Sequence, residues 1–241
     1  MRKNIMALSY SKSTAFTVIA VLLTGCSTVS DKQYLDPFEN TNRGVHAFNE
    51  GFDEVVLTPV SKAYVAVTPD PVEKGVSNFF DNLGYPSVVL NQFLQGKVGD
   101  GFEGIGRFGI NSTLGLFGLF DVATEMGLEA KQEDFGQTFA AWGFGSGPYV
   151  VSPFIGGTTL RDGIGNIATI FTNPGFWINE SGAPLGLFAG ATIDTSAQLL
   201  EERELVPGDS YLFLRDSYLQ RRQFLIADGA VVEDDPFLDD E

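Results

Sequence analysis

The stretch from Arg107 to Asp121 constrains this chain more than any other, because it is long, apolar and uncharged between its two ends. As a helix, its uncharged interior would reach only about 20 Å at about 1.5 Å per residue, whereas the hydrocarbon core of a bilayer is about 30 Å thick. Gly115 and Gly118 each cost a helix interior about 1 kcal/mol relative to alanine. The sequence therefore predicts a segment that does not span a membrane and that breaks at residues 114–118.

Two interpretations of this stretch remain open, because an apolar run of this length occurs both at membranes and in protein cores. The first is an apolar hairpin that dips into one leaflet of a bilayer. The second is the buried hairpin of a soluble helical domain. The first predicts an exposed apolar patch larger than the few hundred Å² usual for soluble monomers. The membrane-facing side chains would then be Leu114, Leu116, Phe117, Leu119 and Phe120.

The N-terminus is typical of a secretory signal, with basic residues ahead of the apolar run 15–23. The sequence Leu23-Thr24-Gly25-Cys26 resembles the bacterial lipoprotein box, in which the cysteine becomes the lipidated first residue of the mature protein. Cys26 is the only cysteine, which excludes an intramolecular disulfide. Ser27 follows it, and the general sorting pattern of such signals then implies the outer membrane. We expect a signal peptide over 1–25, lipidation of Cys26 and a tether over 26–35.

The charge of the chain limits its partners. The formal net charge is −16, and removing residues 1–25 with their three basic side chains lowers it to −19. A chain this acidic repels phosphate backbones, so nucleic acid is not an expected partner. A basic patch that would attract anionic lipid is equally disfavoured. Any affinity for lipid must come from apolar surface and the covalent anchor.

The remaining pattern predicts a mainly α fold in one domain, because apolar residues recur at helical spacing and period-two alternation is too weak for an extended sheet. We expect a ring-like domain of short amphipathic helices over 36–229 and a disordered acidic tail over 230–241. Gly84-Tyr85-Pro86 is expected to separate two helices. Thr159 is a candidate N-cap for the helix that starts at Leu160, and Asp209 or Ser210 is expected to start the last helix.

Glycines between residues 99 and 109 give two overlapping matches to the dinucleotide fingerprint. That fingerprint requires a preceding strand, and a helical pattern precedes it here, so we expect closely packed helix backbones and no cofactor. A lipase is disfavoured, because the chain has no Gly-x-Ser-x-Gly motif and its one histidine, His46, is expected on a solvated helix face. One histidine and one cysteine also leave no zinc constellation, so no enzyme activity and no metal are expected.

Several short blocks occur in a fixed order along the chain. They are Asp36-Pro37-Phe38-Glu39 with Asn42-Arg43, Asn78-Phe79-Phe80-Asp81-Asn82-Leu83, Leu94-Gln95-Gly96, Arg107-Phe108 with Asn111-Ser112-Thr113-Leu114-Gly115, Asp134-Phe135-Gly136-Gln137-Thr138, Gly147-Pro148-Tyr149 and Thr159-Leu160-Arg161-Asp162. With these blocks the chain, from about Asp36 to Ala227, resembles the MlaA/VacJ outer-membrane lipoproteins.

This resemblance implies an all-helical ring in the inner leaflet of the outer membrane of a Gram-negative bacterium. Phospholipids misplaced in the outer leaflet would pass inward through its amphipathic channel. It also implies trimeric porins and a soluble periplasmic phospholipid carrier as partners. The alternative function is a structural, porin-associated lipoprotein without a channel. A channel protein and a scaffold would both contain apolar helices, so the sequence leaves both functions open.

A channel for phospholipid needs polar groups for the headgroup beside apolar walls. The candidates flank the apolar core of the sequence, and we expect them to gather near a solvent-accessible passage; they are Arg107, Asn111, Asp121, Arg161 and Asp162. For Arg161 and Asp162 the alternative is an ion pair or a helix cap that braces the ring.

Overall fold

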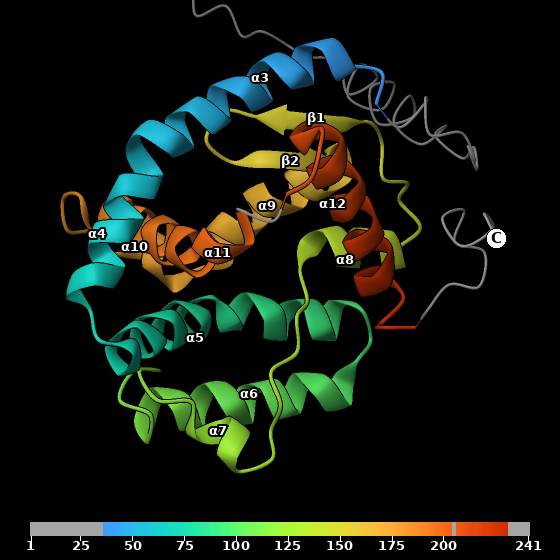
Figure 1. Ribbon diagram of the computed structural model, residues 1–241. Helices are drawn as coiled ribbons and strands as arrows, with labels where there is room; N and C mark the ends of the chain where they lie inside the picture. Colours follow the sequence, from blue (N-terminus) through green and yellow to red (C-terminus); the bar gives the residue numbers. More distant parts are fainter. Residues whose placement is uncertain (1–35, 204–205, 231–241) are drawn as a thin grey trace, which may run out of the picture.

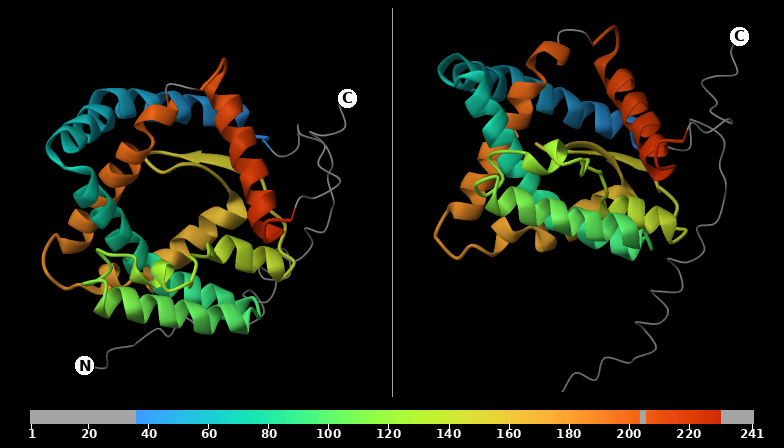
Figure 2. Two further views of the ribbon diagram at one scale, coloured as in Figure 1. Left: turned by 60° about the horizontal axis from the view of Figure 1, so that its bottom comes forward. Right: turned by 90° about the horizontal axis from the view of Figure 1, so that it is seen from below.

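The computed structural model describes residues 36–203 and 206–230, and its helices follow one another round a ring (Figures 1 and 2). The elements are α3 (Glu39–Phe52), the π-helical turn η1 (Asp53–Leu57), α4 (Thr58–Val67), α5 (Asp70–Leu94), α6 (Val98–Thr113), α7 (Val122–Glu125), α8 (Phe135–Ala141), β1 (Tyr149–Ser152), β2 (Gly156–Thr159), α9 (Leu160–Thr172), the 3₁₀ turn η2 (Pro174–Trp177), α10 (Ala183–Gln198), α11 (Leu200–Arg203) and α12 (Ser210–Ile226). The mainly α, ring-like fold expected from the sequence is confirmed. No helix in the described ranges is both long and apolar enough to cross a membrane. The signal peptide, Cys26, the rest of the tether and nearly all of the acidic tail lie outside the described residues.

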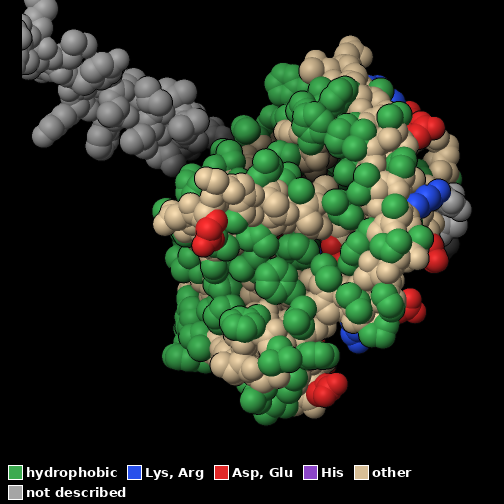
Figure 3. Space-filling view, turned by 90° about the vertical axis from the view of Figure 1, so that its left-hand side faces the viewer, with side chains coloured by type: hydrophobic (Ala, Val, Ile, Leu, Met, Phe, Trp, Pro, Cys, Tyr) green, Lys and Arg blue, Asp and Glu red, His purple; other side chains and the backbone are tan. Residues whose placement is uncertain are grey.

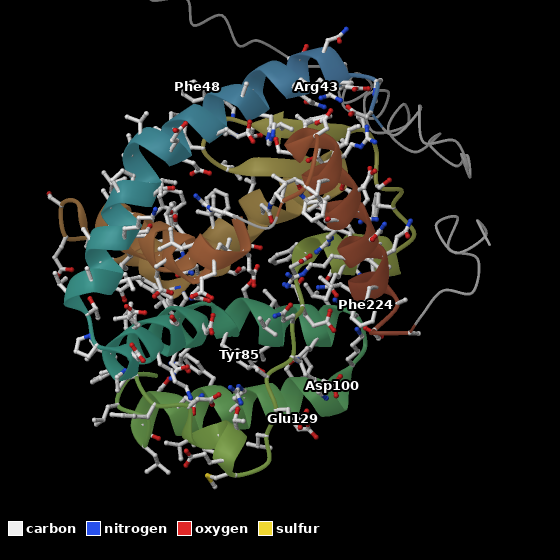
Figure 4. The ribbon with its side chains drawn as sticks, in the orientation of Figure 1. Arg43, Phe48, Tyr85, Asp100, Glu129 and Phe224 are labelled. Atoms are coloured by element: carbon white, nitrogen blue, oxygen red, sulfur yellow. The ribbon has the colours of Figure 1, made fainter. Side chains whose placement is uncertain are left out.

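The predicted break at Gly84-Tyr85-Pro86 is wrong, because α5 continues through it as one helix from Asp70 to Leu94. Pro86 removes one hydrogen bond of the helix. Packing outweighs that loss, because Tyr85, Asn91 and Gln92 are buried on the same helix. Figure 4 places Tyr85 between α5 and α6.

The glycines of α6 allow it to approach α5 closely. A Cβ at Gly101 would lie 2.6 Å from Phe93 Cζ, and a Cβ at Gly104 would lie 2.7 Å from Gln92 Oε1. The expected close packing of helix backbones is therefore confirmed at these two positions. Gly99 and Gly109 face open space, so packing does not explain them.

A small antiparallel hairpin, β1 with β2, pairs Tyr149 with Thr159 and supplies the centre of the modest hydrophobic core. Strands of four residues are too short for the alternation of apolar and polar side chains to be recognised in the sequence. The sequence therefore predicted that there is no extended sheet, but it did not predict this hairpin. Tyr149 and Val151 of β1 pack with Tyr211 of α12.

Helix α12, the last described helix, is bonded to Asp36, the first described residue. Asp36 accepts hydrogen bonds from the Tyr211 hydroxyl and from Arg215 Nη1, the second at 3.2 Å. Arg43 of α3 forms an ion pair with Asp209 at 2.8 Å, at the junction of α3 and α12 in Figure 4. Both termini of the described fold are therefore fastened to each other.

Polar and apolar side chains are distributed in an unusual way for a chain of this size. The large side chains that are almost fully buried are polar, among them Gln92, Asn42 and Asn91. Many large apolar side chains are exposed, and Figure 3 shows them covering most of the face formed by α4 and α10. An apolar outer surface of this extent indicates a partner or a membrane.

Candidate functional site

The apolar loop between α6 and α7 is held in an uncommon backbone conformation. Leu116 and Phe117 have φ values of 51° and 61°, a left-handed region that costs non-glycine residues free energy. The loop is pressed against α5, because a Cβ at Gly118 would lie 2.4 Å from Asn82 Cβ. Asn78 Nδ2 also donates to the Leu119 carbonyl at 3.2 Å. The break predicted at residues 114–118 is confirmed.

The side chains of this loop point outward. Phe117 is 77% exposed and Leu119, the least exposed of the set, is 41% exposed, while Leu114, Leu116 and Phe120 lie between these values. The interpretation as the buried hairpin of a soluble domain is therefore wrong for the described structure. Contact of these side chains with lipid stays a prediction.

Arg107, Asn111 and Asp121 form one cluster at the base of this loop. Arg107 Nη2 lies 2.6 Å from Asp121 Oδ2, and Asn111 Nδ2 donates to Asp121 Oδ1 at 2.9 Å. Asn111 Oδ1 accepts from the Ala123 amide at 2.9 Å. Desolvation acts to raise the pKa of Asp121, but hydrogen bonds from Thr124, Asn111 and Arg107 outweigh it and lower the pKa to about 2.

These three residues line one cavity of about 300 Å³ between α5, α6 and the segment 130–134. Tyr85 forms part of its wall, and the Arg107 guanidinium carbon lies 5.6 Å from the centre of its ring. Lys131, Asp81 and Leu225 also line it. The cavity thus combines both signs of charge with apolar surface, which is the chemistry that a phospholipid headgroup and its first carbons require.

Arg161 and Asp162 lie elsewhere, so the expectation that all the candidates gather at one passage is wrong. Arg161 Nε donates to Asp162 Oδ1 at 2.8 Å, and Tyr218 donates to Asp162 Oδ2 at 2.7 Å. Thr159 Oγ1 caps α9 by accepting from the Asp162 amide at 3.3 Å, as the sequence predicted. The reason for the separation is that α12 and the cap of α9 hold these side chains away from the cavity.

Arg222 and Tyr218 of α12 complete this second cluster, and no pattern in the sequence indicated them. Arg222 Nη2 donates to Asp134 Oδ1 at 3.0 Å and to Asp162 Oδ1 at 3.1 Å. Burial acts to raise the pKa of Asp162, yet the bonds from Arg161 and Tyr218 lower it below its ordinary value. The pairing supports the alternative interpretation, in which Arg161 and Asp162 brace the ring.

Glycines let α8 and α9 meet at this brace. A Cβ on Gly165 would lie 2.6 Å from the Gly136 amide nitrogen, so any larger residue would separate the two helices. Asp134 caps α8 by accepting from the Gln137 amide at 2.9 Å. The block Asp134-Phe135-Gly136 was a visible signal for this junction, but nothing in it identified α12 as the partner.

His46 is not on a solvated helix face as expected, because its side chain is only 13% exposed and packs edge-on against Tyr211 at 5.6 Å. His46 Nε2 lies 3.0 Å from Ser210 Oγ and 3.3 Å from Glu50 Oε1. Ser210 Oγ itself donates to Glu50 at 2.6 Å. A hydrolytic triad needs the serine and the carboxylate on different ring nitrogens, so this arrangement does not support a nucleophilic serine.

Replacing Arg107 with methionine is expected to lower the free energy of unfolding by about 1–3 kcal/mol, because Asp121 loses its cation while keeping Asn111 and Thr124. A lowered pKa means that the Asp121 contribution is present above its ordinary pKa of about 4 and is lost as the pH falls through about 2. In Arg107→Met the pKa rises, so the loss begins at a higher pH. Denaturant titrations over this pH range, with the exposed Lys62→Met as control, measure both effects. Equal acid sensitivity of the two variants would contradict the assignment.

Comparison with known proteins gives one consistent result. The family model described as MlaA lipoprotein matches residues 34–225. The intermembrane phospholipid transport system lipoprotein MlaA of Escherichia coli (strain K12) is 35% identical over 223 residues, which cover 89% of this chain and 88% of that protein. The protein of the same name from Haemophilus influenzae is 31% identical over 234 residues, covering 92% and 93%. A chain solved in work on the "Structural basis for maintenance of bacterial outer membrane lipid asymmetry" superposes with a TM-score of 0.71 at 35% identity, over 79% of this chain and 98% of that one.

Proposed function

Because this chain belongs to the MlaA lipoprotein family, we propose that it removes misplaced phospholipids from the outer leaflet of the outer membrane and passes them inward to a soluble periplasmic carrier. Lipid asymmetry of the outer membrane is maintained by such retrograde transport. The protein lies on the periplasmic side, held by the lipid on Cys26. It carries out no covalent chemistry on the lipid.

The observation that carries this proposal is the arrangement of the apolar loop above the cavity of Arg107, Asn111 and Asp121. The loop offers exposed apolar side chains to acyl chains, and the cavity begins where the loop meets α6. A headgroup that leaves the bilayer loses hydration, and polar side chains at the exit offset that cost of several kcal/mol. The loop that would contact the membrane thus lies next to the cavity that would hold the headgroup.

The second candidate function is a porin-associated scaffold without transport. The exposed apolar face in Figure 3 is the surface on which a trimeric porin would pack, and a scaffold needs no polar cavity. Phospholipid that copurifies after mild detergent extraction, and that is lost in Arg107→Met, supports transport. Extraction without bound lipid supports the scaffold.

The test of transport is transfer of labelled phospholipid from vesicles that carry the acylated protein to a soluble acceptor. Folded Arg107→Met should transfer lipid more slowly than the wild type, since the cavity loses the cation at its Asp121 end and keeps only Lys131. Folded Arg161→Met should transfer at the wild-type rate, since Arg161 pairs with Asp162 outside the cavity. Equal rates for the wild type and both variants would contradict a headgroup role for Arg107.

Replacing Phe117 with arginine is expected to impair membrane insertion far more than folding. Its side chain is 77% exposed, so the change costs little in the folded protein, whereas a cation placed in the acyl region costs about 3 kcal/mol, or a loss of vesicle affinity of about 100-fold. Vesicle flotation of the unacylated protein, in the Cys26→Ala background, and thermal unfolding separate the two effects. The matched control is Val67→Arg at the end of α4, an equally exposed apolar position outside the loop. Undiminished flotation of Phe117→Arg would show that the loop stays outside the bilayer.

A further inference from the structure

The chain contains two tryptophans, and both are exposed in the same manner. Trp142 follows α8, is 52% exposed, and donates its indole nitrogen to the carbonyl of Leu94, the last residue of α5, at 3.1 Å. Its ring lies 6.0 Å from that of Phe139, which in turn packs edge-on against the exposed Phe144. We refer to Phe139, Trp142 and Phe144 as the Trp142 patch.

Trp177 repeats this arrangement at the end of η2. It is 64% exposed, and its indole nitrogen donates to the carbonyl of Phe171 near the end of α9 at 2.9 Å. Phe176 packs edge-on against Trp177 and against Phe171, both at 5.4 Å between ring centres. We refer to Phe171, Phe176 and Trp177 as the Trp177 patch.

Each indole N–H already has a hydrogen-bond acceptor within the fold, so it needs none from water. A tryptophan ordinarily keeps its N–H near water or another acceptor. Here a carbonyl of the fold already accepts from each N–H, so the exposed part of each ring is apolar and fixed in direction. Exposed aromatic patches of this kind gain free energy when an apolar medium covers them.

The two patches are supported by the same two helices. α8 and η2 both pack on α5 and α9, and the indole hydrogen bonds end on those same two helices. Figure 2, right, shows α5, α6 and α8 on one side of the ring and α3 on the opposite side, with α12 running from α3 toward α8. The two patches and the loop between α6 and α7 are therefore separate exposed apolar surfaces, and the patches share the same two supporting helices.

The chain outside the described residues indicates what covers the patches. From Cys26 to Asp36 the backbone can span at most about 34 Å, so a lipidated Cys26 keeps a bilayer within that distance of the ring. With a net charge of −19 once residues 1–25 are removed, the protein approaches phospholipid phosphates most easily through uncharged surface, and no patch member is charged. A bilayer is thus the occupant that lies close enough and has suitable chemistry.

We infer that Trp142 and Trp177 are the two anchors that seat the ring in the upper acyl region of one leaflet and set its depth and tilt. This inference rests on the proposed function for the presence of the bilayer. It adds that the orientation of the ring is determined by three separated contacts, the two patches and the apolar loop, and not by the loop alone.

Intrinsic fluorescence tests this directly, because the two indoles are the only ones in the chain. Acylated Trp142→Phe and Trp177→Phe each keep one reporter. On binding vesicles of phosphatidylethanolamine and phosphatidylglycerol, each reporter should shift its emission to the blue. Each should lose most of its emission to lipid brominated near the top of the acyl chain, and less to lipid brominated near its end. Replacing either indole with serine should weaken vesicle binding about tenfold.

The matched control carries Phe213→Trp in the Trp142→Phe and Trp177→Phe background. Phe213 is a half-exposed residue in the first turn of α12, at the end of that helix that meets α3 and away from α8, so its reporter should not be quenched. Flotation with lipid but without quenching of Trp142 or Trp177 would contradict this inference and leave the proposed function intact. Absence of flotation of the acylated protein would contradict both.

Discussion

Asp162→Ala is expected to lower the free energy of unfolding by about 3–5 kcal/mol, because the buried guanidinium groups of Arg161 and Arg222 both lose a carboxylate partner. Asp162 is nearly fully buried and bonds to Arg161, Arg222 and Tyr218 at once. For a domain of this size the midpoint of thermal unfolding should fall by about 6–20 °C. Thermal and denaturant unfolding of the full chain in mild detergent measure the change.

The control for this prediction is Asp216→Ala on α12. Asp216 also binds an arginine, Arg215, at 2.9 Å, but its side chain is 34% exposed, so the loss should stay below about 1 kcal/mol. Because the pKa of Asp162 is lowered, its contribution is present at neutral pH and is lost as the pH falls through that lowered pKa. Equal destabilisation by the two substitutions would show that the cluster does not brace the ring.

Cys26→Ala should abolish acylation completely and release the protein from the outer membrane, since the chain has no other cysteine. A single apolar loop gives only weak, reversible membrane binding compared with covalent lipid chains. Labelling with a fatty-acid analogue and fractionation of the envelope test this. Ser27→Ala, which keeps the cysteine, is the control. An unlabelled Cys26→Ala protein that stayed in the outer membrane and still transported lipid would contradict the anchor.

The sequence predicted those parts of the fold whose causes are local. The caps Thr159 and Asp209, the break in the apolar loop and the exposure of Phe117 depend on residues within one turn of one another. Helix α5 was divided wrongly, because proline and glycine act locally while the packing of Tyr85 against α6 does not.

For the same reason, the sequence predicted the partners within one of the two polar clusters and not those within the other. Arg107 and Asn111 lie on neighbouring turns of α6, and Asp121 closes the short loop that follows this helix, so their proximity depends on a short stretch of chain. Arg161 and Asp162 are also adjacent, but their partners Tyr218 and Arg222 lie about sixty residues further on. No local pattern indicates which face of α12 meets them, so the split into two clusters became visible only in three dimensions.

The bonds from Tyr211 and Arg215 to Asp36 join residues 175 and 179 positions apart, and this separation has a consequence for how the chain folds. Contacts so distant in sequence form late, since the entropy of closing the intervening loop must be overcome before they contribute. The helices ahead of α12 therefore lack this closure, with their apolar faces uncovered, until α12 has joined them. A chain that ends ahead of α12 is expected to aggregate or to be degraded, and not to form a smaller ring.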